Sequence, residues 1–410
     1  MIKHLLKVFT FLAFFIFACK LQAQDNKIVA GLLLTWVDDP TSTMVIDIHT
    51  SSDYQGKNTL YYKLATAKTW NEFQGESFAF PFSTKKITRF YLKNLTAAGN
   101  YEFTFGTDKT VYRFRTMPLN TKKGVTFITG GDTMHDKAHM DRTNKAVLAL
   151  NPDFIVLGGD LAYANGLEKN LGRWEQWFQS VQETLIDKDN RIIPIVAGIG
   201  NHEVVDGTYK KHPDFKDTNE WRKKIAPYFY TFFAFPGLRG YNVLDFKNYL
   251  SLVALDTDHS NPIKGEQTQW LAQTLATRNK KVDFIFPFYH VPAYPSNRAF
   301  SASNSKEIRE HFVPLFEKNG VRVAFENHDH TYKRTYPIFE NKIDETGKGI
   351  VYIGDGAWGV NTRPITKKEW YLKEAQSIRH FIAVTLKNNQ ASFRMINENG
   401  VQFDSYQYKK

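Results

Sequence analysis

The stretch that decides the fold is Phe154–Tyr163, which reads Phe-Ile-Val-Leu-Gly-Gly-Asp-Leu-Ala-Tyr. Its first four residues are apolar and include two β-branched side chains, which is typical of a strand covered on both faces. Gly158 and Gly159 then end the apolar run, and Asp160 follows directly. Because ligands of open α/β sheets bind beyond the carboxyl ends of the strands, we expect Asp160 and Tyr163 to lie at a functional site.

The same order of an apolar strand and then a polar side chain recurs along the chain. Since the carboxyl ends of parallel strands meet at one edge of a sheet, these polar side chains are expected to share one rim. The runs and the residues that follow them are 125–129 with Asp132, 154–157 with Asp160 and Tyr163, 192–197 with Asn201 and His202, 282–288 with His290, and 321–325 with His328 and His330.

Oxygen and nitrogen donors of this kind suit first-row metal ions and not thiophilic ones. Apart from His202 there are seven of them, too many for one tetrahedral zinc ion and about right for two ions that share a carboxylate. Asp160 is the natural bridge because a carboxylate has two oxygens. A single motif would fit an ordinary turn, but the five together predict a binuclear metal site. The histidines without such a context are expected to be surface or core residues: His49, His135, His139, His212 and His259.

Composition limits the class of protein. A chain of 410 residues can form two or three domains, and its 42% apolar and 23% charged residues are those of a globular protein. The only cysteine is Cys19, so the rest of the chain has no disulfide, no thiolate metal site and no cysteine nucleophile. A run of Lys and Arg with interleaved aromatics is missing, so no nucleic-acid-binding surface is expected, and no segment after the leader is long enough to span a membrane.

Residues 1–23 are predicted to be a signal peptide. A basic start precedes the apolar core Val8–Ala18, and small residues allow cleavage after Ala23. We therefore expect an exported protein, periplasmic or secreted. Cys19 offers the alternative of a lipid anchor, which the bulky Phe17 disfavours. Removing the leader lowers the formal net charge from +11 to +8, which favours anionic ligands such as phosphate esters.

Residues 24–118 consist of short alternating segments separated by turns, without helical periodicity. This pattern predicts a β-sandwich. The segment 95–101 resembles the corner between strands in fibronectin type III-like domains. No polar cluster with catalytic spacing occurs here. The predicted strands are 28–36, 44–49, 60–64, 88–95, 101–105 and 111–115.

Residues 119–410 alternate compact apolar runs with amphipathic stretches, which predicts α/β layers. Further apolar runs at 249–255 and 350–353 predict additional strands. The segments near 240–248 and after residue 381 have the pattern of antiparallel strands, which indicates mixed sheets. The predicted helices are 141–150, 173–185, 218–228 and 266–278.

The motifs resemble, in the same order, the five signature blocks of the binuclear metallophosphoesterases of the calcineurin-like superfamily, and within them the purple acid phosphatases. The resemblance covers most of residues 124–360 and implies a layered α/β/β/α domain with mixed sheets at 119–410, after a fibronectin type III-like domain. The blocks are Gly131-Asp132, Gly159–Tyr163, Gly200–Glu203, His290 and His328–His330, with similar stretches at 255–257, 265–267 and 332–334.

The resemblance further implies two sets of metal ligands bridged by Asp160. Carboxylate and phenolate donors in one set favour Fe³⁺, whereas neutral donors in the other suit Zn²⁺, Mn²⁺ or Fe²⁺. The first set is Asp132, Tyr163 and His330, and the second is Asn201, His290 and His328.

The expected activity is hydrolysis of small phosphomonoesters by in-line attack of a metal-bound hydroxide. Asp160 and His202 would then be the catalytic residues. Asn201 is also expected to contact the substrate. His202 beside it would bind phosphate or assist proton transfer, although a histidine that only orients the Asn201 loop is the alternative.

One segment departs from the family pattern. Purple acid phosphatases often have one or two histidines soon after the block of His290, to protonate the leaving group, and 291–298 contains none. Tyr294 and Arg298 are the candidates for contacting phosphate there. The departure leaves open a phosphodiesterase or nucleotidase that uses the same centre. A surface binding protein with a vestigial site is a third alternative, against which the intact ligand set argues; the substrate, the divalent ion and the oligomeric state stay open.

Overall fold

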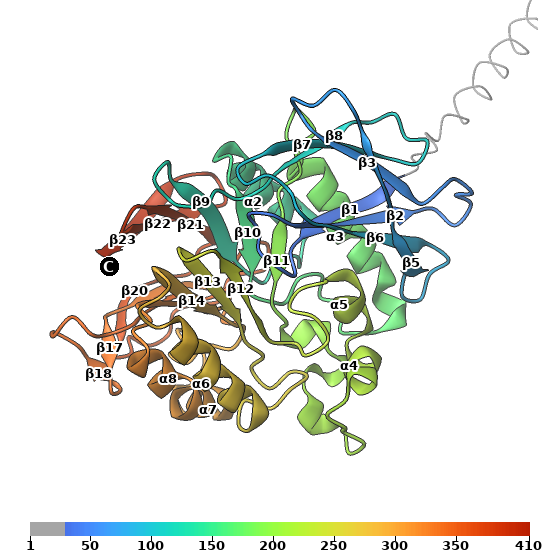
Figure 1. Ribbon diagram of the computed structural model, residues 1–410. Coiled ribbons are helices and arrows are strands. Elements are labelled where there is room, and N and C mark those ends of the chain that lie inside the picture. The colour runs from blue at the N-terminus through green and yellow to red at the C-terminus, as the bar shows by residue number, and fades with distance from the viewer. Residues whose placement is uncertain (1–28) are drawn as a thin grey trace, which may run out of the picture.

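The computed structural model describes residues 29–410, which form a β-sandwich packed against a layered α/β body (Figure 1). The predicted signal peptide, 1–23, and Cys19 lie outside the described residues. Within 29–410 no helix has both the length and the apolar character that crossing a bilayer requires.

The N-terminal part is an antiparallel sandwich of two four-stranded sheets, ordered β1-β2-β6-β5 and β4-β3-β7-β8. The sequence missed β4 and β5 because these edge strands are mostly exposed and lack apolar alternation. The predicted boundary at 118–119 falls between β8 and β9. The strands are β1 (Val29–Thr35), β2 (Met44–Thr50), β3 (Thr59–Leu64), β4 (Asn71–Gln74), β5 (Glu76–Ala79), β6 (Lys86–Leu92), β7 (Asn100–Phe105) and β8 (Tyr112–Arg115).

The body has two mixed sheets, ordered β11-β10-β9-β21-β22-β23 and β12-β13-β14-β15-β19-β16-β20, beside a small β17-β18 hairpin. The strands are β9 (Val125–Gly130), β10 (Phe154–Leu157), β11 (Ile195–Ala197), β12 (Asn242–Phe246), β13 (Leu250–Ala254), β14 (Phe284–Phe288), β15 (Val323–Phe325), β16 (Tyr332–Thr335), β17 (Ile338–Phe339), β18 (Lys342–Ile343), β19 (Val351–Gly354), β20 (Leu372–Gln376), β21 (His380–Lys387), β22 (Gln390–Asn397) and β23 (Gln402–Lys409).

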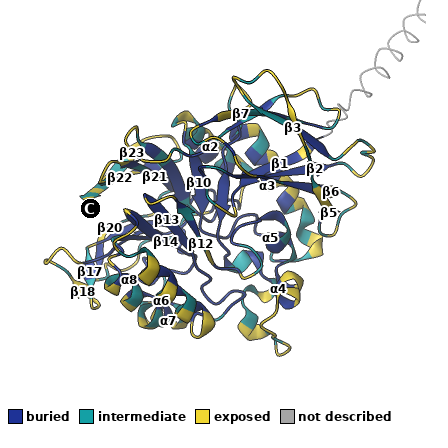
Figure 2. Cartoon of the chain, viewed as in Figure 1, coloured by how far each residue is buried: buried dark blue, intermediate teal, exposed yellow. Residues whose placement is uncertain are grey.

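Helices cover the outer faces of both sheets, so the layers are α/β/β/α, and the predicted fold class is confirmed. The helices expose their outer faces, whereas the central strands of the two sheets are buried and the edge strand β23 is largely exposed (Figure 2). The expected helix 218–228 is in fact two helices, because Pro227 begins the second. The helices are α2 (Lys137–Ala149), α3 (Leu171–Thr184), α4 (Asn219–Ile225), α5 (Pro227–Phe232), α6 (Glu266–Arg278), α7 (Ser303–His311) and α8 (Val313–Lys318), with short 3₁₀ turns η1 (Glu168–Asn170), η2 (Asn201–Glu203), η3 (Val205–Gly207) and η4 (Tyr209–Lys211).

The sandwich and the body share one apolar core. Trp36 is fully buried, and its ring meets the edges of Phe154 and Phe246 at centroid distances of 5.8 Å. On the same side, Arg89 pairs with Asp47 at 2.6 Å and also donates to two backbone carbonyls of α5. The sandwich is therefore fixed to the body by both apolar and charged contacts.

His49 of β2 is buried at this junction, and its burial makes the folded protein less stable in acid. Its ring lies 4.5 Å from that of Phe178, and burial, followed by the charges of Arg89 and Lys85, lowers its pKa to about 3. The folded protein keeps His49 neutral, while the unfolded chain protonates it below about pH 6.5. This contribution to stability is complete above pH 6.5 and is lost as the pH falls towards 3. We expect the unfolding free energy to fall by about 1.4 kcal/mol per pH unit within that window.

Urea unfolding at pH 7 and pH 5 measures the effect. The His49→Leu variant should show a smaller loss between the two pH values, because leucine binds no proton in the unfolded chain. Phe178→Leu alters the same packing but removes no titratable group, so this matched control should keep the wild-type pH dependence. An identical pH dependence for wild type and His49→Leu would contradict the assignment.

Candidate metal centre

Five loops meet where parallel strands of the two sheets end. In the first sheet β9, β10 and β11 run parallel, and in the second β14 and β15 do. Every predicted ligand stands on a loop that directly follows one of these strands. The rim expected from the sequence therefore exists, and the seven predicted ligands gather on it in two groups.

The first group is a triangle of Asp132, Tyr163 and His330. The Tyr163 hydroxyl lies 3.0 Å from Asp132 Oδ1 and 3.1 Å from His330 Nε2, and that nitrogen is 3.0 Å from the same Asp132 oxygen. All three side chains are buried. Three donor atoms from three different loops thus converge on one point.

The second group is centred on His290 Nε2. Asp160 Oδ2 lies 3.0 Å from this nitrogen, Asn201 Oδ1 lies 3.2 Å from it and His328 Nδ1 lies 3.0 Å from it. The two groups adjoin, because Asp132 Oδ2 accepts a hydrogen bond of 3.0 Å from the backbone N–H of His328. Asp160 and Tyr163, three residues apart on one loop, contribute to different groups.

The tautomers of the histidines test whether these residues fit metal ions. Nδ1 of His290 lies 3.0 Å from the carbonyl oxygen of Gly158, which can only accept, so Nδ1 carries the proton. Nε2 of the neutral ring then presents a lone pair to the oxygens of Asp160 and Asn201. His330 is arranged in the same way, with Nδ1 facing the carbonyl oxygen of Asn361 at 3.3 Å. Two bare lone pairs cannot face one another at this distance, so Nε2 of each ring must either carry a proton or bind a metal ion, and the donor set fits metal ions once that proton is lost.

The charges of the groups point to the same conclusion. Burial lowers the pKa of His290, but the carboxylates of Asp160 and Asp132 outweigh it and raise the pKa to about 9. Burial, by contrast, keeps the pKa of the Tyr163 phenol well above its usual value, with Asp132 adding to the effect. The site therefore attracts positive charge at His290, and Tyr163 stays protonated unless a cation binds it.

The backbone at the site is strained. Asp132, Asp160, Tyr163, His328 and His330 all have positive φ, between 53° and 79°. Each such residue costs on the order of 1–3 kcal/mol and persists only where the surrounding structure enforces it. Because five of the seven predicted ligands have this conformation, we infer that the surrounding structure holds the loops in strained conformations that position the ligand side chains.

Glycine allows two of these loops to approach closely. A Cβ on Gly200 would lie 2.3 Å from Asp160 Oδ1, and a Cβ on Gly356 would lie 1.8 Å from Asp132 Oδ2. Both glycines therefore stand where any side chain would displace a predicted ligand.

Glu203, quoted in the sequence motif but given no role there, ties two of the loops together. Its buried carboxylate accepts hydrogen bonds from the backbone N–H groups of Asp160, Leu161 and Gly200 at 2.7–2.8 Å. Burial and the charge of Asp160 raise the pKa of Glu203 to about 8, against the effect of those donors. Its place directly after Asn201-His202 was the only sequence signal for this function.

His202 lies beside the two groups. Its Nδ1 is 2.5 Å from Asn165 Oδ1, its Nε2 is 3.9 Å from Asp160 Oδ2, and its ring packs against that of Tyr163 at 4.2 Å. Its backbone N–H donates to Asp160 Oδ1 at 2.7 Å. His135, expected to be a surface or core residue, covers Tyr163 as well, at a centroid distance of 4.3 Å.

A sixth strand end, after β19, also belongs to the site and was missed. Gly354-Asp355-Gly356 follows the apolar run that had been recognised as a strand, so the signal was present in the sequence. Asp355 accepts from the backbone N–H of His330 at 2.9 Å through its carbonyl oxygen. Behind it, fully buried Lys333 lies 2.5 Å from Glu326 Oε2 and 3.1 Å from Asp355 Oδ1.

Of the two candidates in 291–298, only Arg298 lies at the rim. Its Nη1 donates to the carbonyl oxygen of His328 and to Asp329 Oδ1, both at 2.6 Å. Tyr294, however, is fully buried, its ring 4.7 Å from that of Tyr352, and its hydroxyl donates to Asn341. The proposed contact of Tyr294 with phosphate is therefore wrong, since a side chain enclosed in the aromatic core cannot meet substrate.

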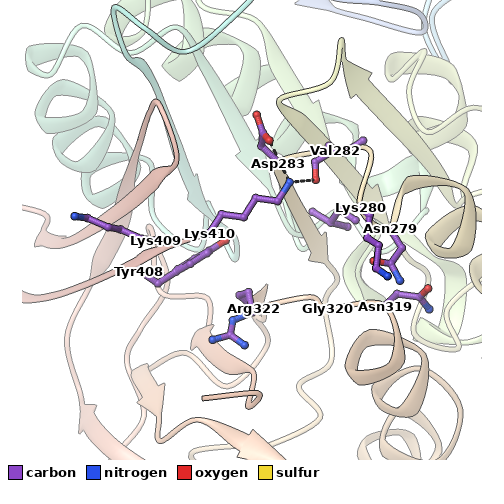
Figure 3. A pocket seen from close by; sticks show the side chains of 11 residues that line it. Asn279, Lys280, Val282, Asp283, Asn319, Gly320, Arg322, Tyr408, Lys409 and Lys410 are labelled. Carbon is purple, nitrogen blue, oxygen red and sulfur yellow. Dashed lines mark hydrogen bonds and ion pairs between the residues drawn. The ribbon is translucent and has the colours of Figure 1, made fainter. Parts of the chain in front are cut away.

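Figure 3 shows a pocket that is separate from this rim. Val282, Asp283 and Arg322, which line it, precede β14 and β15, so the pocket lies at the amino ends of the strands whose carboxyl ends carry His290 and His328. Lys410 extends across it and donates to the Val282 carbonyl oxygen and to Asp283.

Comparison with known proteins agrees with the geometry. Residues 131–332 match the family described as calcineurin-like phosphoesterase. Purple acid phosphatase 18 of Arabidopsis thaliana is 24% identical over 326 residues, which cover 75% of this chain and 68% of that protein. A second Arabidopsis relative, named as probable inactive purple acid phosphatase 27, is 27% identical over 48% of this chain and 32% of its own length.

Among solved structures, purple acid phosphatase PPD1 from yellow lupin (Lupinus luteus) superimposes with a TM-score of 0.77 at 16% identity, over 92% of this chain and 74% of that one. This likeness is one of fold, and it includes the sandwich as well as the body. Residues 131–332 therefore form a calcineurin-like phosphoesterase domain, and the resemblance of the chain to the purple acid phosphatases, with a β-sandwich before that domain, is confirmed.

Proposed function

We propose that this protein is an exported phosphatase that hydrolyses phosphomonoesters at a binuclear metal centre. One observation above all supports the proposal: side chains from five separate strand ends form two adjoining groups whose oxygen and nitrogen atoms converge to within 3.0–3.2 Å of one another. The export part is supported by the sequence pattern of residues 1–23.

The ligand roles follow the two groups. Asp132, Tyr163 and His330 would hold one ion, and Asn201, His290 and His328 the other, with Asp160 bridging. The carboxylate and phenolate of the first group favour Fe³⁺, and the neutral donors of the second suit Zn²⁺, Mn²⁺ or Fe²⁺. When bound, such ions neutralise charge on the phosphate and lower the pKa of water at the site.

His202 is placed to handle a proton next to this phosphate. Its Nδ1 faces the amide oxygen of Asn165, so the proton of the neutral ring lies on Nδ1 and Nε2 is free to accept one. Burial lowers the pKa of His202 although Asp160 opposes the shift, so the ring is mostly neutral near pH 7. We assign His202 Nε2 the role of binding the phosphate or exchanging a proton with it.

The overall charge of the chain favours monoesters. A phosphomonoester carries one more negative charge than a diester, and the chain without residues 1–23 has a formal net charge of +8. A phosphodiesterase or nucleotidase is the second candidate, because no histidine follows His290 in 291–298 to protonate an alcohol leaving group.

Purified protein loaded with iron and zinc tests the proposal with p-nitrophenyl phosphate and bis-p-nitrophenyl phosphate. We expect the monoester to be hydrolysed at least about tenfold faster, two metal ions per chain, and a broad visible charge-transfer band that Tyr163→Phe abolishes. The mature protein should begin near Gln24. Faster hydrolysis of the diester would select the second candidate, and loaded protein inactive on both esters would contradict phosphatase function.

A further inference from the structure

Two arginines from different loops meet at the backbone of His328. Arg298 Nη1 donates to the carbonyl oxygen of His328 at 2.6 Å, and Arg363 Nη1 lies 3.5 Å from the same oxygen. The backbone N–H of Arg363 donates to the carbonyl oxygen of His330 at 3.0 Å, which fixes its loop to the ligand loop. Both side chains are half-buried. Arg363 was not predicted from the sequence, because it stands 35 residues after His328 and outside the recognised motifs.

The charge of this pair is not balanced by the protein. Asp329 is the carboxylate that pairs with Arg298, at 2.6 Å, and among residues 29–410 no carboxylate forms an ion pair with Arg363. Two guanidinium groups in this arrangement are stabilised by an anion that contacts both.

The donors that remain point to an exogenous ligand. Each guanidinium has five N–H groups, and the described residues accept hydrogen bonds from a single nitrogen, Nη1, of each. Nε and Nη2 of both arginines are therefore free, and the planar forks suit the oxygens of a phosphate.

The position of the pair separates it from the metal ligands. The ring of His328 contacts His290, whereas both arginines contact the backbone carbonyl oxygen of His328, and among the described residues neither guanidinium forms a hydrogen bond or ion pair with a side-chain donor atom of the two groups. The arginines therefore lie beside the phosphoryl site and not within it. A group that meets them must project from the leaving-group part of a substrate.

We propose that Arg298 and Arg363 form a second anion site, which selects phosphate esters or anhydrides that carry another phosphate on the leaving group. The inference rests on the proposed function for its reaction, in which water adds across one P–O bond, orthophosphate is released, and the second phosphate stays on the leaving group. Inorganic pyrophosphate is the smallest such compound.

Calorimetric titration of the metal-loaded protein with orthophosphate and with methylenediphosphonate, an analogue of pyrophosphate that cannot be hydrolysed, tests the proposal. We expect the analogue to bind to wild type more tightly than orthophosphate, and Arg363→Gln and Arg298→Gln each to weaken its binding on the order of ten- to a hundredfold. Binding of orthophosphate should stay within about threefold, which also shows that the variants keep their fold. Lys367→Gln, which removes an exposed charge from the same loop, is the matched control and should change neither affinity.

Three results would overturn the proposal: equal affinity of wild type for the two anions, equal weakening of both in the arginine variants, or no weakening of either. Equal weakening would place the arginines at the transferred phosphoryl group or give them a purely structural role. The measurement does not depend on turnover, so it is separate from the proposed function. Protein that binds methylenediphosphonate selectively but hydrolyses no ester would contradict the proposed function and still support the anion site.

Discussion

The Asp160→Asn variant is expected to lose phosphatase activity by at least about 10³-fold while it remains folded. Asp160 stands where the loops after β10 and β11 meet, with one oxygen 3.0 Å from His290 Nε2 and the other accepting the backbone N–H of His202. The substitution removes the charge that two cations would share. Asparagine has nearly the same shape and tolerates the positive φ of 53° at this position, so the loop should persist. The assay with p-nitrophenyl phosphate, together with metal content and circular dichroism, measures the outcome.

Asp206→Asn provides the matched control. Asp206 is an exposed aspartate three residues after Glu203, and its φ of 57° is close to that of Asp160. The same chemical change in the same backbone conformation should leave activity and metal content unaltered. If Asp160→Asn kept wild-type activity, the proposed mechanism would be contradicted, because hydrolysis would then not need the bridging carboxylate.

The ligands could be predicted from the sequence because the pattern that marks each of them is local. Asp132 and Asp160 each follow an apolar strand and a pair of glycines, and the end of the apolar run marks the carboxyl end of the strand. His290, which no glycine precedes, was found because the run before it is a buried strand. The pairing of Asp132 with Tyr163 and His330 came from family resemblance, since nothing in the spacing of three distant loops states which of them touch.

The contacts that support the ligand loops could not be predicted, because they join residues that are far apart in the sequence. Arg363 acts at an oxygen 35 residues away, and the three backbone N–H groups that bind Glu203 belong to two loops more than 35 residues apart. Such contacts follow from how the loops pack, which a single sequence does not state. Tyr294 shows the opposite error: its position four residues after His290 suggested that it lies at the rim, but its ring packs in the core beside Tyr352.

Lys333→Met is expected to lower the free energy of unfolding by about 3–5 kcal/mol. Lys333, Glu326 and Asp355 are fully buried, and the ammonium lies 2.5 Å from the carboxylate of Glu326 and 3.1 Å from that of Asp355. Removing the cation leaves two carboxylates without compensation in the interior. Burial already raises the pKa of Asp355, and Lys333 opposes that rise, so the loss of the lysine should drive Asp355 towards its protonated form. Equilibrium urea unfolding at pH 7 measures the change.

The double variant Lys333→Met with Glu326→Gln distinguishes loss of charge balance from loss of packing. If uncompensated charge is the cause, the second substitution should recover part of the stability, whereas a packing defect would add to the damage. Lys306→Met removes an exposed lysine whose pair with Glu310 is 3.6 Å long, and it should cause no measurable change. Since Asp355 also accepts hydrogen bonds from Ser296 and from the backbone of His330, Lys333→Met should weaken metal binding as well. A Lys333→Met protein of wild-type stability would show that the buried carboxylates are protonated and that the lysine does not hold the loops behind the site.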